Sequence, residues 1–207
     1  ELFVENKRWN VPVLLGHTSS EFISKPHVSS IDEFKKMAVD MFGDDADEYL
    51  KICGADSGDI DEVLEKASVN SIEYAIRVVG QANADTGANT PLYYYNFDVE
   101  IPGWDNPGAF HSVDLWFTFE TLAKCWRPFV GKHYDIARQI CNYWCNFIRS
   151  GDPNGKDITG EDMPKWDVYT PEGPYGMVFR DKAELLKEEA SDLMKFLVRH
   201  YFKRREK

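Results

Sequence analysis

In this sequence of 207 residues, one glutamate and one histidine each lie in a loop that follows a run typical of a buried strand. Glu21 lies in the loop after an apolar run at residues 11–16, and His111 lies in the loop after an aromatic run at residues 91–98. In open α/β sheets, ligands bind beyond the carboxyl ends of the strands. A histidine that acts as a base needs a carboxylate to fix its tautomer and to stabilise the imidazolium. We therefore predict an acid and base pair, against the alternative that His111 is an ordinary solvated loop residue.

Alternating strands and helices are expected to position this pair. Short apolar or aromatic runs predict buried strands at residues 11–16, 91–98 and 175–179. Apolar side chains at helical spacing predict helices at residues 31–42, 46–53, 60–66, 71–81 and 134–149, one more just after His111, and a last one from Ala183 to about residue 203. This alternation is typical of an α/β fold with a mostly parallel sheet flanked by helices. Three strands are few for such a sheet, so we expect an incomplete sheet in a single portion spanning residues 1–207.

The composition argues against several kinds of partner. The chain has 24 basic and 35 acidic residues and a net charge of -11, which disfavours a nucleic acid or an anionic membrane surface. No apolar run approaches the length of a membrane span. The cysteines lack the spacing of a zinc site, and the acidic stretches from Asp45 and Asp59 lack the EF-hand pattern. We expect no metal and no cofactor, and free thiols give a weak preference for the cytoplasm.

A nucleophile to complete the pair is not found in the sequence. The pattern G-x-S-x-G puts a serine on a strained turn between strand and helix, and none of the glycines belongs to one. The nearest candidate, Ser57 between Gly54 and Gly58, has the wrong spacing. Adjacent glycines that would supply oxyanion amides are absent too. We therefore expect the nucleophile to lie outside these residues.

Several segments resemble type-B carboxylesterases, the cholinesterase-like family. Gly-Ala-Phe-His-Ser-Val-Asp-Leu-Trp-Phe-Thr-Phe, at residues 108–119, is similar to the segment around the family's catalytic histidine. Tyr-Trp-Cys-Asn-Phe-Ile-Arg-Ser-Gly-Asp-Pro-Asn at residues 143–154 and Pro-Lys-Trp-Asp-Val-Tyr-Thr-Pro at residues 164–171 resemble its downstream helix and closing segment. Residues 11–22 resemble the strand and loop that present the acid, although members usually carry Asp-Glu-Gly where this chain has Ser20-Glu21-Phe22. The resemblance runs, in order, over nearly the whole chain.

The resemblance implies the C-terminal part of an α/β-hydrolase that acts on a small-molecule carboxylic ester. In the sequence of an α/β-hydrolase, the catalytic serine comes first, the acid second and the histidine last. The serine and the oxyanion hole are then expected on a missing N-terminal portion, and this chain alone is expected to be inactive. His111 would take the serine proton and return it to the leaving alcohol, while Glu21 orients the ring. The residues expected to line the substrate pocket, unless they belong to the core, are Phe22, Phe110, Trp116 and Phe117.

Two alternatives stay open. Asp114, three residues after His111, is a second carboxylate near the ring, although on a helix we expect it to anchor the segment. The chain could also be a catalytically inactive cholinesterase-like fragment or an interaction module, since folds of this kind also serve in adhesion. An incomplete sheet exposes an unpaired edge and apolar surface, so we also expect self-association.

Overall fold

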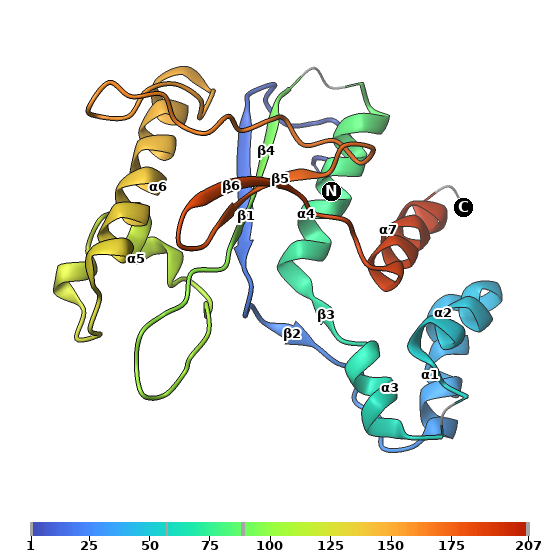
Figure 1. The fold of residues 1–207 in the computed structure, drawn as a ribbon. Coiled ribbons are helices and arrows are strands. Elements are labelled where there is room, and N and C mark those ends of the chain that lie inside the picture. Colours follow the sequence, from blue (N-terminus) through green and yellow to red (C-terminus); the bar gives the residue numbers. More distant parts are fainter. Residues whose placement is uncertain (1, 57, 88–89, 206–207) are drawn as a thin grey trace. The chain divides into compact units, whose positions relative to one another are not determined.

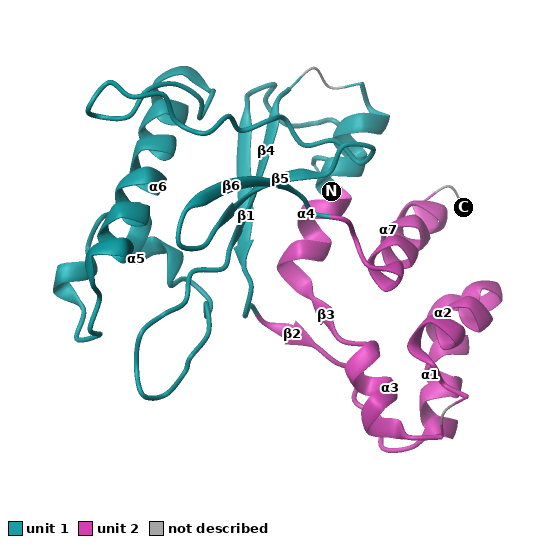
Figure 2. Cartoon of the chain, viewed as in Figure 1, with its two compact units in different colours: residues 1–21, 79–188 teal, residues 22–78, 189–207 magenta. Residues whose placement is uncertain are grey.

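The chain divides into two compact units. The computed structural model describes residues 2–56, 58–87 and 90–205, so Ser57 lies outside the described residues. Unit 1 comprises residues 1–21 and 79–188, and unit 2 comprises residues 22–78 and 189–207 (Figure 2). Glu21 and His111 therefore both belong to unit 1.

A four-stranded sheet forms the centre of unit 1 (Figure 1). Its strands are β1 (Val13–Thr18), β4 (Leu92–Phe97), β5 (Tyr175–Phe179) and β6 (Ala183–Lys187), in the order β1-β4-β5-β6. The first three run parallel, and β6 pairs antiparallel with β5 as a hairpin. This confirms the predicted α/β fold with a mostly parallel sheet. It also brings the carboxyl ends of β1 and β4 next to each other.

The first strand begins and ends two residues later than predicted. Pro12 has no amide hydrogen to donate, and pairing starts at Val13, whose amide donates to the carbonyl of Pro91 at 2.9 Å. The strand then continues through His17 and Thr18, whose polar side chains had favoured a loop. Both are buried, and the ring nitrogens of His17 lie 2.9 Å from the Thr18 carbonyl and 2.8 Å from the Tyr94 hydroxyl. Because these contacts satisfy the ring inside the fold, the strand ends only three residues before Glu21.

Helices pack on the sheet of unit 1. They are α5 (Asp114–Thr118), the short 3-10 helix η2 (Leu122–Lys124) and α6 (Gly131–Ser150), together with the end of α4 (Ser71–Asp85). The predicted helix at residues 134–149 is confirmed as α6, and Gly151 ends it at φ 76°. One face of α6 is buried, at Ile136, Ile140 and Tyr143. Figure 1 shows α5 and α6 together on one side of the strands. The segment that begins at His111 therefore leads directly into a packed layer of helices.

Unit 2 is mainly helical. It contains α1 (Ile31–Phe42), η1 (Gly43–Asp45), α2 (Ala46–Cys53), α3 (Ile60–Lys66), the start of α4, α7 (Asp192–Arg205) and a small antiparallel pair, β2 (Ile23–Ser24) with β3 (Val69–Asn70). Ser30 caps α1 as its position predicts, by accepting from the Glu33 amide at 3.2 Å. Phe34, Tyr49 and Phe196 are buried together in the core of this unit.

The prediction of one long helix from Ala183 to about residue 203 is wrong. Residues 183–187 form β6, and the helix begins only at Asp192. The pattern Ala-Glu-Leu-Leu-Lys is too short to separate a strand from a helix by periodicity. A tight turn, in which the Arg180 amide donates to the Lys182 carbonyl at 3.1 Å, folds these residues back along β5. The sheet pairing then decides their conformation.

Candidate active site

The loops that carry Glu21 and His111 run side by side beyond the ends of β1 and β4. Ser20 forms a parallel bridge with Phe110, and its amide donates to the Ala109 carbonyl at 3.1 Å. These bonds extend the parallel pairing of the two strands into the loops. Gly108 permits the approach: it has φ 62°, and a Cβ atom there would meet the Ser20 hydroxyl at 2.6 Å. Strand order and a local glycine thus bring together two residues that are ninety positions apart in sequence.

The predicted acid and base are in direct contact. Nδ1 of His111 lies 2.6 Å from Oε2 of Glu21. The Glu21 side chain is 5% exposed, whereas that of His111 is 47% exposed. An ionised carboxylate only accepts hydrogen bonds, so the imidazole donates from Nδ1. That tautomer puts the basic lone pair on Nε2, as a general base requires.

The surroundings of Glu21 keep it ionised. Burial acts to raise the pKa of this carboxyl, but the hydrogen bonds from His111 and from the Thr18 amide outweigh it, so the pKa lies below that of an ordinary glutamate. The Thr18 amide donates to Oε1 at 3.3 Å, while His111 binds the other oxygen. Each carboxylate oxygen therefore has a partner that holds it. The pair can orient and stabilise a histidine that gains and loses a proton.

A turn holds the backbone at His111. Ser112, the next residue, has φ 67°, a left-handed conformation that is uncommon outside glycine. The Val113 amide donates to the Phe110 carbonyl at 3.1 Å, and the Val113 side chain is fully buried. Strain of this kind costs roughly 1 kcal/mol or more and clusters at functional sites.

Asp114, the second carboxylate close to His111 in sequence, has a hydrogen-bond partner of its own. The Tyr95 hydroxyl donates to Oδ2 of Asp114 at 2.9 Å. Asp114 begins α5 and is bound to β4 through this contact. It anchors the segment after His111, as expected from its place on a helix.

The four aromatic residues expected around the pocket occupy different environments. Phe117 is fully buried and packs against Phe97 at 4.9 Å between ring centroids, so it is a core residue. Phe110 and Trp116 are half-buried and meet edge to face at 5.7 Å. Phe22 is 63% exposed and belongs to unit 2. Within unit 1, Phe110 and Trp116 are the ones with surface available to a ligand.

Sequence reasoning missed two residues of the site, Thr18 and Tyr95. The signal for Tyr95 was Gly16, since a glycine inside an apolar strand marks a close approach by another group. Gly16 is paired with Tyr95 across the sheet, and a Cβ atom on Gly16 would lie 2.1 Å from the Tyr95 ring. Nothing in the sequence marks the Thr18 amide, because a backbone donor carries no residue signature.

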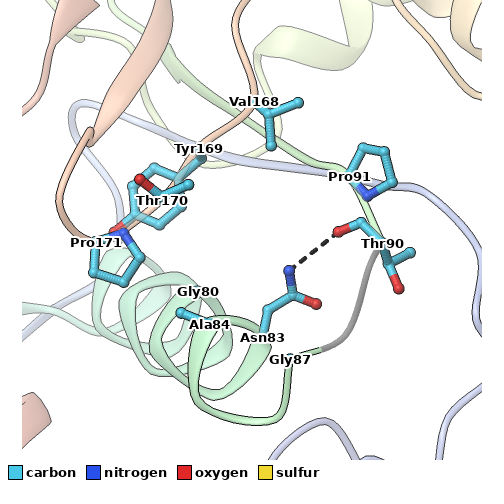
Figure 3. A pocket seen from close by; sticks show the side chains of 10 residues that line it. All are labelled: Gly80, Asn83, Ala84, Gly87, Thr90, Pro91, Val168, Tyr169, Thr170 and Pro171. Atoms are coloured by element: carbon cyan, nitrogen blue, oxygen red, sulfur yellow. Dashed lines mark hydrogen bonds between the residues drawn. The ribbon is translucent and has the colours of Figure 1, made fainter.

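A separate cavity of about 360 Å³ lies away from these residues, where the loop before β4 meets α4 (Figure 3). Gly80, Asn83 and Tyr169 contribute to its lining, and Asn83 donates to the Thr90 carbonyl at 3.1 Å. None of the predicted site residues lines it. In the described part of the chain, no cluster of three or more metal-ligating side chains occurs, and no helix is long and apolar enough to cross a membrane.

Comparisons with known proteins agree with the fold and with the family resemblance of the sequence. A family profile described as the carboxylesterase family matches residues 46–194. Carboxylesterase 1F of Mus musculus is 24% identical over 196 residues, which cover 87% of this chain and 33% of that protein. Acetylcholinesterase of Gallus gallus is 33% identical over 87 residues, which cover 40% of this chain and 11% of that protein.

A solved structure of a thermophilic PNB esterase has a similar fold, with a TM-score of 0.65 and 18% identity over 94% of this chain and 40% of that chain. The chain thus spans about a third or less of the length of the two curated relatives. Its sheet corresponds to part of the sheet of an α/β-hydrolase. Because the family profile covers most of its residues, this chain belongs to the carboxylesterase family.

Proposed function

We propose that this chain is the part of a serine carboxylic-ester hydrolase that supplies the triad acid, Glu21, and the triad base, His111. The observation that carries the proposal is the 2.6 Å contact between a buried carboxylate and Nδ1 of a half-exposed imidazole. A buried acid behind an accessible base is the arrangement that general-base catalysis by histidine needs.

The proposed reaction is acyl transfer through a serine. Nε2 of His111 takes the proton from the serine hydroxyl as its oxygen attacks the ester carbonyl. The imidazolium, stabilised by Glu21, then gives that proton to the leaving alcohol. In the second half, His111 takes a proton from water, the resulting hydroxide attacks the acyl-enzyme, and the serine recovers its proton. Glu21 stays ionised throughout, in keeping with its lowered pKa.

The serine and the oxyanion amides are proposed to come from residues outside this sequence, since G-x-S-x-G does not occur in it. The sheet supports this proposal. Among the described residues, β1 lies at one end of the sheet and pairs with β4 alone. Parallel strands are usually buried and covered, and an apolar strand such as β1 is unusual at an edge. We propose that further strands of the complete enzyme pair with β1.

The proposed substrate is a small carboxylic ester. Phe110 and Trp116 flank His111 in sequence and keep part of their surface accessible. Aromatic faces of this kind suit an apolar acyl or alcohol group.

A fluorophosphonate probe tests the proposal, because it labels only an activated serine. The chain is expected to stay unlabelled by itself. Joined to the protein segment encoded directly upstream, it is expected to label on a serine of that segment and to lose the label in the His111→Ala variant. His27→Ala, which removes an exposed histidine in unit 2, is the matched control and should keep full labelling. Labelling that survives His111→Ala would refute the assignment of the base.

The same experiment decides the alternative of an inactive cholinesterase-like fragment or interaction module. In that case the joined protein stays unlabelled, and the upstream segment has no serine in a G-x-S-x-G setting. A functional serine elbow upstream, with labelling that depends on His111, excludes this alternative.

A further inference from the structure

Tyr95 contacts the segment that carries His111 without being part of the proposed triad. It pairs with Gly16 on β1 and with Met177 on β5, so its backbone is held on both sides. Its ring lies directly over Gly16, at a distance that leaves no room for a Cβ atom there. Trp144 packs edge to face on the same ring, at 5.1 Å between centroids. The position of the Tyr95 hydroxyl is therefore fixed by two strands and a helix.

The hydroxyl is directed at the segment that carries the base. It donates to Asp114 at 2.9 Å, and Asp114 is three residues after His111. Burial raises the pKa of Tyr95, and the carboxylates of Asp114 and Glu21 raise it further. The phenol consequently stays protonated and remains a donor under ordinary conditions.

The segment around His111 has a fixing contact on each side. On the N-terminal side, the bridge between Ser20 and Phe110 ties it to the loop of Glu21. On the C-terminal side, the Tyr95 hydroxyl ties it to β4. Between them, Ser112 holds an uncommon left-handed conformation. A strained turn keeps its geometry only when its surroundings determine it fully, so loss of either contact releases the imidazole.

We propose that Tyr95 is a positioning residue, which acts through its hydrogen bond to Asp114 to hold the His111 imidazole against Glu21. This inference rests on the proposed function, because it assigns a role toward the base of that site. It gives Asp114 a second purpose besides starting α5. It also explains why β1 has a glycine at position 16, opposite the tyrosine.

The test measures the tautomer of His111 in the chain itself. In long-range ¹H–¹⁵N spectra recorded at alkaline pH, the neutral ring shows which nitrogen carries the hydrogen. The signals of His111 are identified by their loss in His111→Gln. The wild-type chain is expected to favour the Nδ1–H form, because Glu21 accepts from that nitrogen.

Tyr95→Phe and Asp114→Ala are each expected to lower the ratio of Nδ1–H to Nε2–H by roughly fivefold, the effect of one lost hydrogen bond. The double variant should lower it no further than either single variant, because both remove the same contact. Asp114→Asn keeps an acceptor for Tyr95 and is expected to retain the wild-type ratio.

Tyr143→Phe is the matched control. The Tyr143 hydroxyl donates to the Pro164 carbonyl at 2.7 Å. Its removal deletes a comparable tyrosine hydrogen bond in unit 1 that does not involve the segment around His111. The control should lower stability and leave the tautomer ratio unchanged. An unchanged ratio in Tyr95→Phe overturns the inference while the proposed function stands. An equal fall in Tyr143→Phe overturns it too, since the effect is then general. A wild-type ring without the Nδ1–H preference removes the acid and base pair itself, and with it both proposals.

Discussion

The close approach of the two site loops makes Gly108 a sensitive position. Gly108→Ala introduces two separate costs. An L-residue at φ 62° is strained by about 1–2 kcal/mol relative to glycine. The new Cβ atom also meets the Ser20 hydroxyl at 2.6 Å, and relief of such overpacking costs about 1–3 kcal/mol. The expected loss is therefore about 3 kcal/mol.

Tryptophan fluorescence can measure this loss of stability in unit 1, the part of the chain that contains Gly108. All six tryptophans lie in residues 1–21 and 79–188, so urea unfolding followed by fluorescence reports on unit 1. With a denaturant slope of about 2 kcal/mol per molar urea, a loss of about 3 kcal/mol lowers the midpoint by about 1.5 M. The same variant should weaken the Nδ1–H tautomer of His111, because the bridge between the loops is displaced.

Two further variants separate the two costs. Gly160→Ala places an L-residue at φ 89° with no heavy atom within 4 Å, so it should cost only the backbone strain. Ser20→Ala combined with Gly108→Ala removes the hydroxyl and leaves the Ser20 Cβ position at 3.4 Å, an ordinary contact. The double variant should recover the steric part alone. If Gly108→Ala costs no more than Gly160→Ala, or if removal of the Ser20 hydroxyl recovers nothing, the close contact between Gly108 and Ser20 does not limit this position.

Three other expectations concern individual side chains whose burial affects stability or reactivity. Folding lowers the pKa of Glu21, so the ionised carboxylate stabilises the folded chain. This stabilisation is complete at pH values above the ordinary glutamate pKa of about 4.3 and is lost as the pH falls through the pKa of the folded state. The stability advantage of wild type over Glu21→Gln, measured by urea unfolding, should shrink between about pH 7 and about pH 3. An advantage that does not change would show that folding does not lower the pKa of Glu21. Phe117→Ala should lower the free energy of unfolding by about 3–5 kcal/mol, because its ring is fully buried. Phe119→Ala, at a ring that is 69% exposed, should change it by no more than about 0.5 kcal/mol. Equal losses would disprove the core position of Phe117. Burial raises the pKa of Cys53 to about 11, and burial together with the neighbouring Cys145 thiol raises that of Cys141 to about 11. Both thiols should therefore resist alkylation at about pH 8 until urea unfolds the chain, and rapid labelling of either in the native state would argue against these raised pKa values.

Local patterns were enough to predict the elements that frame the site. The aromatic run of β4 and the apolar face of α6 each depend on side chains close together in sequence. The pairing of Glu21 with His111 followed from a general property of parallel sheets, in which loops after neighbouring strands meet. Residues far apart in sequence were therefore brought together by the order of the strands, with Gly108 permitting the close approach of the two loops.

Features that depend on tertiary contact were not predictable in this way. Residues 183–187 suit a helix as well as a strand, and pairing with β5 determines the outcome. His17 and Thr18 are polar, yet they extend β1 because hydrogen bonds inside the fold satisfy the ring and backbone. Phe117 follows His111 closely in sequence but points into the core, since the first turn of α5 directs it there. A sequence pattern cannot tell which face of such a short helix is buried.

The hydrolysis of a p-nitrophenyl ester by the joined polypeptide, with and without His111, shows whether His111 is the catalytic base. We expect measurable turnover for the joined protein and a fall of about 10⁴-fold or more in kcat for His111→Ala, with Glu21→Gln also severely impaired. Turnover that is unchanged in His111→Ala, in a variant whose unfolding midpoint matches wild type, would contradict this role.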